Sequence, residues 1–233
     1  MNLRKLFQGF CLITSSINFL YFPTHAVAGQ NNTLPPGYAI ASANPLATSA
    51  GLEVLANGGN AFDAAVAVSA VLAVVEPYHS GLGGGGFWLL HHESQHKNIF
   101  IDGREVAPQA AKKDMYLAPD GHVIPGLSLN GGLAAAIPGE PAALVYIAKN
   151  YGRLPLAKTL APAIKLAQEG FLVDKQLNAF LQNEERLEQI KKYPSTAKIF
   201  LKNGRPYRIG ERLIQADLAH TLQLIAEQGE QGF

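Results

Sequence analysis

The sequence has 233 residues, of which 48% are hydrophobic and 16% are charged, with 19 Lys and Arg against 18 Asp and Glu. This composition excludes an intrinsically disordered chain, which needs few apolar residues and a high net charge. It also argues against nucleic-acid binding, because a chain with a formal net charge of +1 and no basic stripe attracts phosphates poorly. The length suits one large domain or two small ones with a substantial core.

The N-terminal segment has the pattern of a secretory signal peptide. Arg4 and Lys5 give a basic start, residues 6–22 are mostly apolar, and Ala26-Val27-Ala28 supplies small residues at alternate positions, as signal peptidase requires. The alternative is a membrane anchor, but polar residues interrupt an apolar run that is already shorter than the ~20 residues of a membrane span. We therefore expect residues 1–28 to be removed.

The mature chain then comprises residues 29–233 and begins at Gly29. The single cysteine, Cys11, lies in the expected signal, so the mature chain has neither disulfides nor cysteine chemistry. Export without disulfides suits a domain that is large enough to be stabilised by packing. We expect a periplasmic or secreted protein that has no membrane association after cleavage.

Helix signals mark both ends of the first two predicted helices. Asn44 followed by Pro45 predicts an N-cap and the first helical residue, and Asn57-Gly58-Gly59 predicts the end of that helix. We expect Leu46, Leu52, Val54 and Leu55 to form its apolar face. The second helix, Ala61 to Val75, is apolar nearly all round, so we expect it to be buried.

The middle of the chain predicts a hairpin and the rest predicts helices. Aromatic and β-branched residues at Phe87–Leu90 and Asn98–Ile101 indicate two strands joined by a polar stretch. Four predicted helices follow. The first begins at Pro141 and ends at Gly152, and the second runs from Pro162 to Gly170. The third is capped by Asp174 and runs to Lys192, and the fourth runs from Ala216 to Glu227.

Residues Gly81–Gly86 match G-x-G-x-x-G by letter, with Asp102 at a suitable distance downstream. A dinucleotide site needs this motif after a strand and before a helix. Here a predicted helix precedes it and a predicted strand follows, which argues against a nucleotide cofactor. The run instead indicates a sharp bend or a close approach to another segment, where only glycine avoids a Cβ clash. A buried turn that contacts no ligand is the alternative.

Four histidines and a glutamate, His79, His91, His92, Glu93 and His96, suggest a metal site. However, adjacent residues of a strand point to opposite faces, so His91 and His92 cannot bind one ion directly. The mature chain has no cysteine ligands, and the sequence has no H-E-x-x-H motif. We expect solvated loop histidines and no metal.

The run Ile101-Asp102-Gly103-Arg104-Glu105 places an arginine at the end of a predicted strand, beside carboxylates and a glycine. A planar guanidinium matches a carboxylate or phosphate with two parallel hydrogen bonds, which lysine cannot copy. Arg104 is therefore a candidate substrate-binding residue. The alternative is a surface arginine that pairs with Glu105 and contributes little.

Several motifs follow one another in a fixed order along the chain. They are Ala41–Ala47, Gly58–Ala65, Glu76-Pro77, His79–Phe87, Asp102–Glu105, Ala107-Pro108, Ile137–Gly139, Tyr151-Gly152 and Pro162–Ala167. Together these motifs closely resemble the γ-glutamyltransferase family (γ-glutamyl transpeptidase, glutathione hydrolase), and the resemblance covers almost everything after Thr33.

This resemblance implies an α+β fold, the four-layer αββα sandwich of N-terminal-nucleophile hydrolases, here only its large-subunit portion. Family members are precursors that cut themselves into a large and a small subunit. The new N-terminal threonine of the small subunit attacks a γ-glutamyl amide, with its own amine as base. Water, an amino acid or a peptide then takes the acyl group from donors such as glutathione. The resemblance implies that Arg104 binds the α-carboxylate of the γ-glutamyl group.

The chain departs from the family pattern at the nucleophile, since none of its threonines matches the processing threonine. These are Thr24, Thr33, Thr48, Thr159, Thr196 and Thr221. We therefore expect no catalytic residue in this chain, no activity from the chain alone, and poor folding without the rest of the sandwich. It is either the N-terminal part of a γ-glutamyl-transfer enzyme, whose partner is the small subunit, or a non-catalytic truncated homologue that acts as a binding or interaction protein. The third alternative is a dinucleotide-dependent oxidoreductase.

Overall fold

Helix α2 (Ala61–Val75) is the most deeply buried element of the computed structural model, which describes residues 37–233. Most of its alanines and valines are buried, as its all-round apolar pattern predicts. It packs against α1 (Pro45–Ala56), α3 (Glu140–Tyr151) and α4 (Leu156–Glu169). The predicted signal peptide, residues 1–28, lies outside the described residues.

The other elements follow in chain order. The remaining helices are α5 (Lys175–Gln182), α6 (Glu184–Lys192), α7 (Pro194–Phe200) and α8 (Ala216–Gln228). The strands are β1 (Gly86–His92), β2 (Lys97–Gly103), β3 (Phe171–Leu172), β4 (Leu201–Lys202), β5 (Arg205–Pro206) and β6 (Arg212–Leu213).

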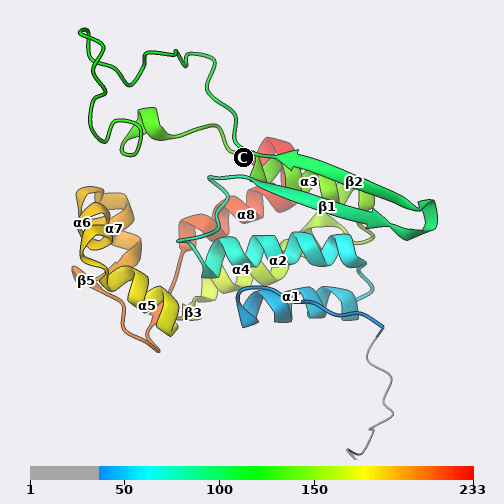
Figure 1. Ribbon diagram of the computed structural model, residues 1–233. Coiled ribbons are helices and arrows are strands. Elements are labelled where there is room, and N and C mark those ends of the chain that lie inside the picture. The colour runs from blue at the N-terminus through cyan, green and yellow to red at the C-terminus, as the bar shows by residue number, and fades with distance from the viewer. Residues whose placement is uncertain (1–36) are drawn as a thin grey trace, which may run out of the picture. The chain divides into compact units, whose positions relative to one another are not determined.

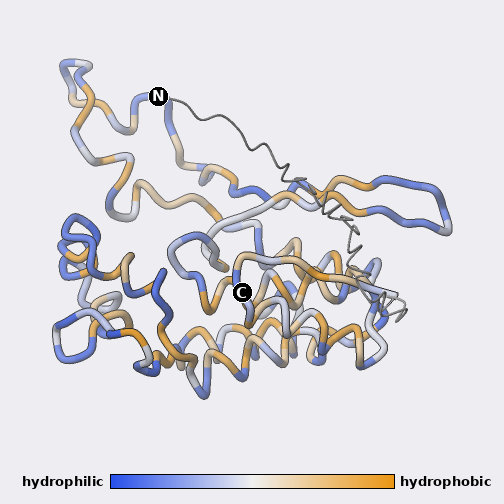
Figure 2. The backbone as a smooth tube through the Cα atoms, turned by 60° about the horizontal axis from the view of Figure 1, so that its bottom comes forward, coloured by the Kyte–Doolittle hydropathy of each residue, from blue (hydrophilic) through white to orange (hydrophobic). Residues whose placement is uncertain are grey.

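Strands β1 and β2 form the predicted hairpin, antiparallel from the pair Gly86–Gly103 to the pair His92–Lys97. Its inner face carries Trp88, Leu90, Ile99 and Ile101, which pack against the helical core. In Figure 1 the hairpin lies along the helices, with α2 and α3 on one side of it. Figure 2 shows that the strands of this hairpin are hydrophobic in their middle and that its tip is hydrophilic, as the sequence pattern predicts.

The outer face of the hairpin is apolar and, among the described residues, uncovered. Phe87, Leu89 and Phe100 lie on this face, and Leu89 is 77% exposed. Strand residues alternate between faces, so an apolar pattern on both faces is typical of a sheet that is covered on both sides. The sheet of β1 and β2 thus has helices on one of its faces, and two further two-stranded sheets pair β3 with β6 and β4 with β5. This mixture of helices and strands agrees with the α+β expectation.

Between β2 and α3 the chain makes a long excursion away from the helices, drawn in green in Figure 1. An antiparallel bridge closes its base, where Val106 and Ile137 exchange backbone hydrogen bonds of 3.1 and 2.9 Å. The bridge brings the end of β2 and the start of α3 together, and this junction forms the candidate site described below.

The predicted helix ends are confirmed where capping residues mark them. Asn44 Oδ1 accepts the Leu46 N–H at 3.0 Å, with Pro45 as the first helical residue. Asp174 Oδ1 caps α5 by accepting the Leu177 N–H at 2.8 Å. Gly58 follows α1 with a φ of 90°, a left-handed conformation that glycine adopts without strain.

Three details of the predicted helices are wrong. The predicted helix from Asp174 to Lys192 is divided at Asn183. The backbone of Asn183 is extended, and its side chain caps α6 by accepting the Arg186 N–H. Helix α4 begins at Leu156 and contains Pro162, since burial of Leu160 outweighs the hydrogen bond that proline removes.

The third correction concerns the buried face of α1. Leu46 and Leu52 are more than one-third exposed, whereas Ala47, Ala50, Gly51 and Val54 are buried. A Cβ on Gly51 would come within 2.5 Å of Ile40 Cδ1 and 2.8 Å of Val68 Cγ2. Small residues therefore let α1 approach α2 closely, so size rather than hydrophobicity decides which face is buried.

Candidate functional site

The glycine run Gly81–Gly86 connects the end of α2 to the start of β1. The order is helix, turn and strand, and no helix begins at the run, so its N–H groups do not form the pyrophosphate site of a dinucleotide fold. The predicted order of helix, glycine run and strand is confirmed. Any functional role of Gly81–Gly86 therefore depends on the segments and side chains that contact these glycines.

Backbone packing explains why glycines occupy this turn and its neighbours. A Cβ on Gly85 would lie 2.8 Å from Arg104 Cα, and a Cβ on Gly139 would collide with the carbonyl oxygens of Gly103 and Arg104. The carbonyl oxygen of Gly84 accepts the N–H groups of Gly139 and Glu140 at 3.0 and 3.1 Å. Three distant segments therefore meet here, and the close approach that the glycine run indicated is confirmed.

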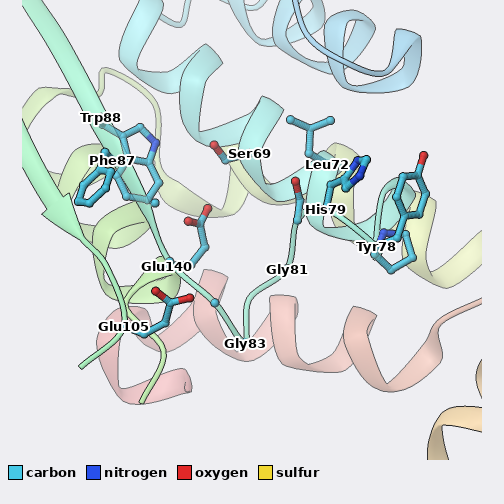
Figure 3. Close-up of a pocket in the computed structure, with 15 residues that line it drawn as sticks. Ser69, Leu72, Tyr78, His79, Gly81, Gly83, Phe87, Trp88, Glu105 and Glu140 are labelled. Atoms are coloured by element: carbon cyan, nitrogen blue, oxygen red, sulfur yellow. The ribbon is translucent and has the colours of Figure 1, made fainter. Parts of the chain in front are cut away.

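A cavity of about 490 Å³ opens beside the glycine run. Its lining comes from α2, from the turn that follows α2, from β1, and from the two segments that meet the turn. Figure 3 shows Glu105 and Glu140 at one end of the pocket and Tyr78 and His79 at the other. The lining residues are Ser69, Leu72, Pro77–Gly81, Gly83–Trp88, Glu105 and Glu140.

Burial shifts the titration of two groups in this pocket. Burial raises the pKa of Glu140 to about 7, because the desolvated carboxyl group favours its neutral form. Burial also raises the pKa of Tyr78 to about 12, and the negative charges of Glu76 and Asp174 add to this effect. Glu140 is therefore a carboxyl group that changes its charge near neutral pH.

Sequence reasoning missed Glu140. The sequence shows only that it follows Gly139 at the predicted start of a helix, where acidic residues are common because the helix dipole favours them. Its place beside the glycine run depends on the hydrogen bonds between Gly84 and residues 139 and 140, which connect segments 55 residues apart.

Arg104 lies at the junction, directly after β2. Its backbone N–H donates to Asp102 Oδ1 at 3.0 Å, and its Nε lies 2.9 Å from Glu105 Oε2 in an ion pair. The guanidinium carbon lies 5.7 Å from the centroid of the Phe87 ring. The side chain is 58% exposed. The alternative pairing with Glu105 is thus present, but it occurs beside the glycine run and not on a remote surface.

Arg104 also borders a second cavity, of about 480 Å³. Strand β2 and α3 form most of this cavity, together with Glu230. Glu105 and Phe87, which contact Arg104, line the first cavity, so the arginine lines the second cavity and touches two side chains of the first.

The histidines do not form a metal site. His91 lies on the exposed side of the hairpin and interacts with Asn98 Oδ1 at 2.8 Å and Glu93 Oε2 at 2.7 Å, and these hydrogen bonds raise its pKa. His92 points to the other face and stacks on Phe62, with ring centroids 6.0 Å apart. Among residues 37–233 no group of three His, Cys, Asp or Glu side chains could hold a metal ion.

A family model described as gamma-glutamyltranspeptidase matches residues 47–233. The chain belongs to the gamma-glutamyltranspeptidase family. A glutathione hydrolase proenzyme of Pseudomonas sp. strain A14 is 39% identical over 95% of this chain and 38% of its own length. That of Escherichia coli K12 is 40% identical over 83% of this chain and 33% of its own length.

Solved structures of this family share the fold. A gamma-glutamyltranspeptidase of Helicobacter pylori superposes with a TM-score of 0.82 at 40% identity, covering 86% of this chain and 57% of that one. The transpeptidase CapD of Bacillus anthracis gives a TM-score of 0.69 at 39% identity, covering 85% of this chain and 61% of that one. The family resemblance seen in the motifs is confirmed. The chain spans between a third and two-fifths of the length of the two proenzymes above.

Proposed function

We propose that the protein containing this chain transfers or hydrolyses γ-glutamyl groups, using glutathione and related γ-glutamyl compounds as donors. Both proenzymes compared above bear the name glutathione hydrolase, and this chain covers 38% and 33% of their lengths. The nucleophile would be an N-terminal threonine outside this chain, because none of the threonines here fits that role. Thr159 and Thr221 lie inside helices, and their hydroxyls hydrogen-bond to backbone carbonyls four residues earlier.

The observation that carries the proposal is the placement of Arg104. Arg104 lines one cavity and contacts Glu105 and Phe87 of the other, and within residues 37–233 its terminal nitrogens make no hydrogen bond. Two parallel N–H donors in a fixed plane fit a carboxylate. In the proposed reaction Arg104 binds the α-carboxylate of the γ-glutamyl group and fixes its position relative to the threonine hydroxyl.

We propose that the small subunit of the same precursor covers the outer face of the β1–β2 hairpin. This face exposes Phe87, Leu89 and Phe100, and burying such side chains favours association by about 25 cal/mol per Å² of apolar surface. Arg104 extends from this hairpin, so a subunit seated there would bring its N-terminus near the arginine. Amino acids, peptides or water would then accept the acyl group.

Export is part of the proposal. The N-terminal pattern supports cleavage after Ala28, which would place the mature protein in the periplasm or outside the cell. None of the helices in the described part of the chain is long and apolar enough to cross a membrane. Mass spectrometry of the native protein would find Gly29 at the N-terminus; an intact Met1 in the exported fraction would contradict this expectation.

The experiment that tests the activity uses the protein as its gene encodes it, purified after any self-cleavage. We expect release of p-nitroaniline from γ-glutamyl-p-nitroanilide and release of glutamate from glutathione. Failure to turn over either donor would contradict the proposal. Intact mass separates the alternative of a non-catalytic truncated homologue, since that protein would show one chain ending at Phe233 and no cleaved partner.

A further inference from the structure

We propose that Phe87 is a positioning residue for Arg104: its ring is a platform on which the guanidinium rests, in the orientation that presents its terminal nitrogens to a carboxylate. The inference rests on the proposed function, since it concerns the arginine that would bind the γ-glutamyl group. It adds an aromatic residue of β1 to that site.

The register of the hairpin brings the ring to the arginine. Phe87 pairs with Asp102 across the two strands, and Arg104 follows Asp102 by two residues. Asp102 shares the outer face of the hairpin with Phe87, and Arg104 is the first residue after β2. The guanidinium carbon accordingly lies 5.7 Å from the centroid of the Phe87 ring, within the ~6 Å at which a cation is attracted to an aromatic face.

A second ring supports the first. Phe100 stacks on Phe87 with centroids 5.5 Å apart and an interplanar angle of 28°. The two rings are 57% and 62% exposed, so neither is a core residue of the described part of the chain. The stack holds the Phe87 ring in one orientation and leaves its contact with Arg104 intact.

Glu105 completes the constraint from another direction. Its carboxylate lies 2.9 Å from Arg104 Nε, and the Phe87 ring lies against the guanidinium. Holding a planar group at its Nε and near an aromatic ring fixes both its position and its tilt. The two terminal nitrogens remain to bind a ligand, and a preorganised fork loses less entropy when the ligand arrives.

The contact between Arg104 and Phe87 would strengthen when the small subunit and the donor cover the site. Cation–π attraction is about 0.5–1 kcal/mol at exposed sites and rises when water is excluded. We therefore expect the platform to matter most in the assembled enzyme with donor bound, and its loss to affect donor binding more than the chemical step.

The experiment compares Phe87→Leu with Phe87→Tyr in the full, self-processed enzyme, using γ-glutamyl-p-nitroanilide as donor. Phe87→Leu keeps an apolar side chain but removes the ring, and should raise KM about two- to five-fold with little change in kcat. Phe87→Tyr keeps the ring and should restore KM to near the wild-type value. Tyr193→Leu, which removes an exposed ring on another element, controls for loss of an aromatic surface residue.

A double-mutant comparison shows whether Phe87 acts through Arg104. In an Arg104→Gln background Phe87→Leu should cause no further rise in KM, because there is no guanidinium left to position. An equal rise in both backgrounds, or a failure of tyrosine to restore KM, would overturn the inference.

The outcomes also separate this inference from the proposed function. If Arg104→Gln leaves KM unchanged, Arg104 does not bind the donor and the proposed role of the arginine fails. If Arg104→Gln raises KM strongly while Phe87→Leu does not, only the platform is wrong. Melting temperature and the extent of self-cleavage, measured for each variant, show whether Phe87→Leu folds and is processed like the wild type.

Discussion

Gly85 and Arg104 are in direct backbone contact, although 19 positions separate them in the sequence. A Cβ on Gly85 would lie 2.8 Å from Arg104 Cα and would collide with the carbonyl oxygen of Gly103. The glycine run therefore sets the place of the arginine, because any side chain at position 85 would push the end of β2 away from the turn.

Gly85→Ala should destabilise the protein by roughly 1–3 kcal/mol, since backbone atoms cannot move aside as a flexible side chain can. It should also weaken donor binding by displacing Arg104. Gly83→Ala is the matched control, because Gly83 is exposed and has no atom within 4 Å of its Cβ position. Equal urea midpoints for the two variants would contradict the role given to Gly85.

Arg104→Lys should raise KM for a γ-glutamyl donor about ten-fold or more in the full enzyme. Lysine keeps the charge but loses the bidentate pair, in which each hydrogen bond to a charged group is worth ~1.5–3 kcal/mol. Steady-state kinetics with γ-glutamyl-p-nitroanilide measures this effect. An unchanged Michaelis constant would mean that the arginine is structural.

Glu140→Gln should make the protein less sensitive to pH. Burial raises the pKa of Glu140 from 4.5 to about 7 in the folded protein. Between these values the unfolded chain releases a proton that the folded protein keeps, so the free energy of unfolding of the wild type falls as pH rises. Glutamine cannot ionise, so the free energy of unfolding of Glu140→Gln does not fall for this reason.

The stability of Glu140→Gln relative to the wild type should therefore increase from about pH 4.5 to about pH 7, by about 3 kcal/mol, and then stay constant. Urea unfolding at about pH 5 and about pH 8 measures the difference. A constant difference between the two curves would show that Glu140 titrates normally.

Asp63→Asn should destabilise the protein by about 2–4 kcal/mol. Asp63 is fully buried, and its carboxylate accepts the Asn60 and Arg153 N–H groups at 2.9 Å and that of Leu154 at 3.4 Å. An amide directs an NH₂ group at some of these donors and leaves them unpaired. Asp217→Asn, at an exposed position in the first turn of α8, should cost less than about 1 kcal/mol in the same unfolding experiment.

Residues 29–233 alone should release no p-nitroaniline from γ-glutamyl-p-nitroanilide above the blank, because the nucleophile that the family uses is not among their threonines. Without the rest of the sandwich this segment should also melt without a sharp transition. Turnover well above the blank, or a compact monomer with a cooperative melt, would contradict these expectations.

The sequence predicted most elements because their signals are local. The caps at Asn44 and Asp174 and the apolar composition of α2 each act within a few residues. It missed the break at Asn183 and the start of α4 at Leu156, because both depend on competition between local hydrogen bonds and burial. The exposed leucines of α1 are a similar case, since close contact with α2 favoured small residues.

By itself the sequence determined the family, the order of the elements and the candidate arginine, since motifs and short-range patterns are written in consecutive residues. Only the tertiary structure decided that Gly84–Gly85, Gly103–Arg104 and Gly139–Glu140 meet. It also decided that Phe87 and Glu105 contact the guanidinium. These contacts join positions up to 56 residues apart. Packing and backbone hydrogen bonding across the folded chain bring such positions together, and no local pattern encodes that approach.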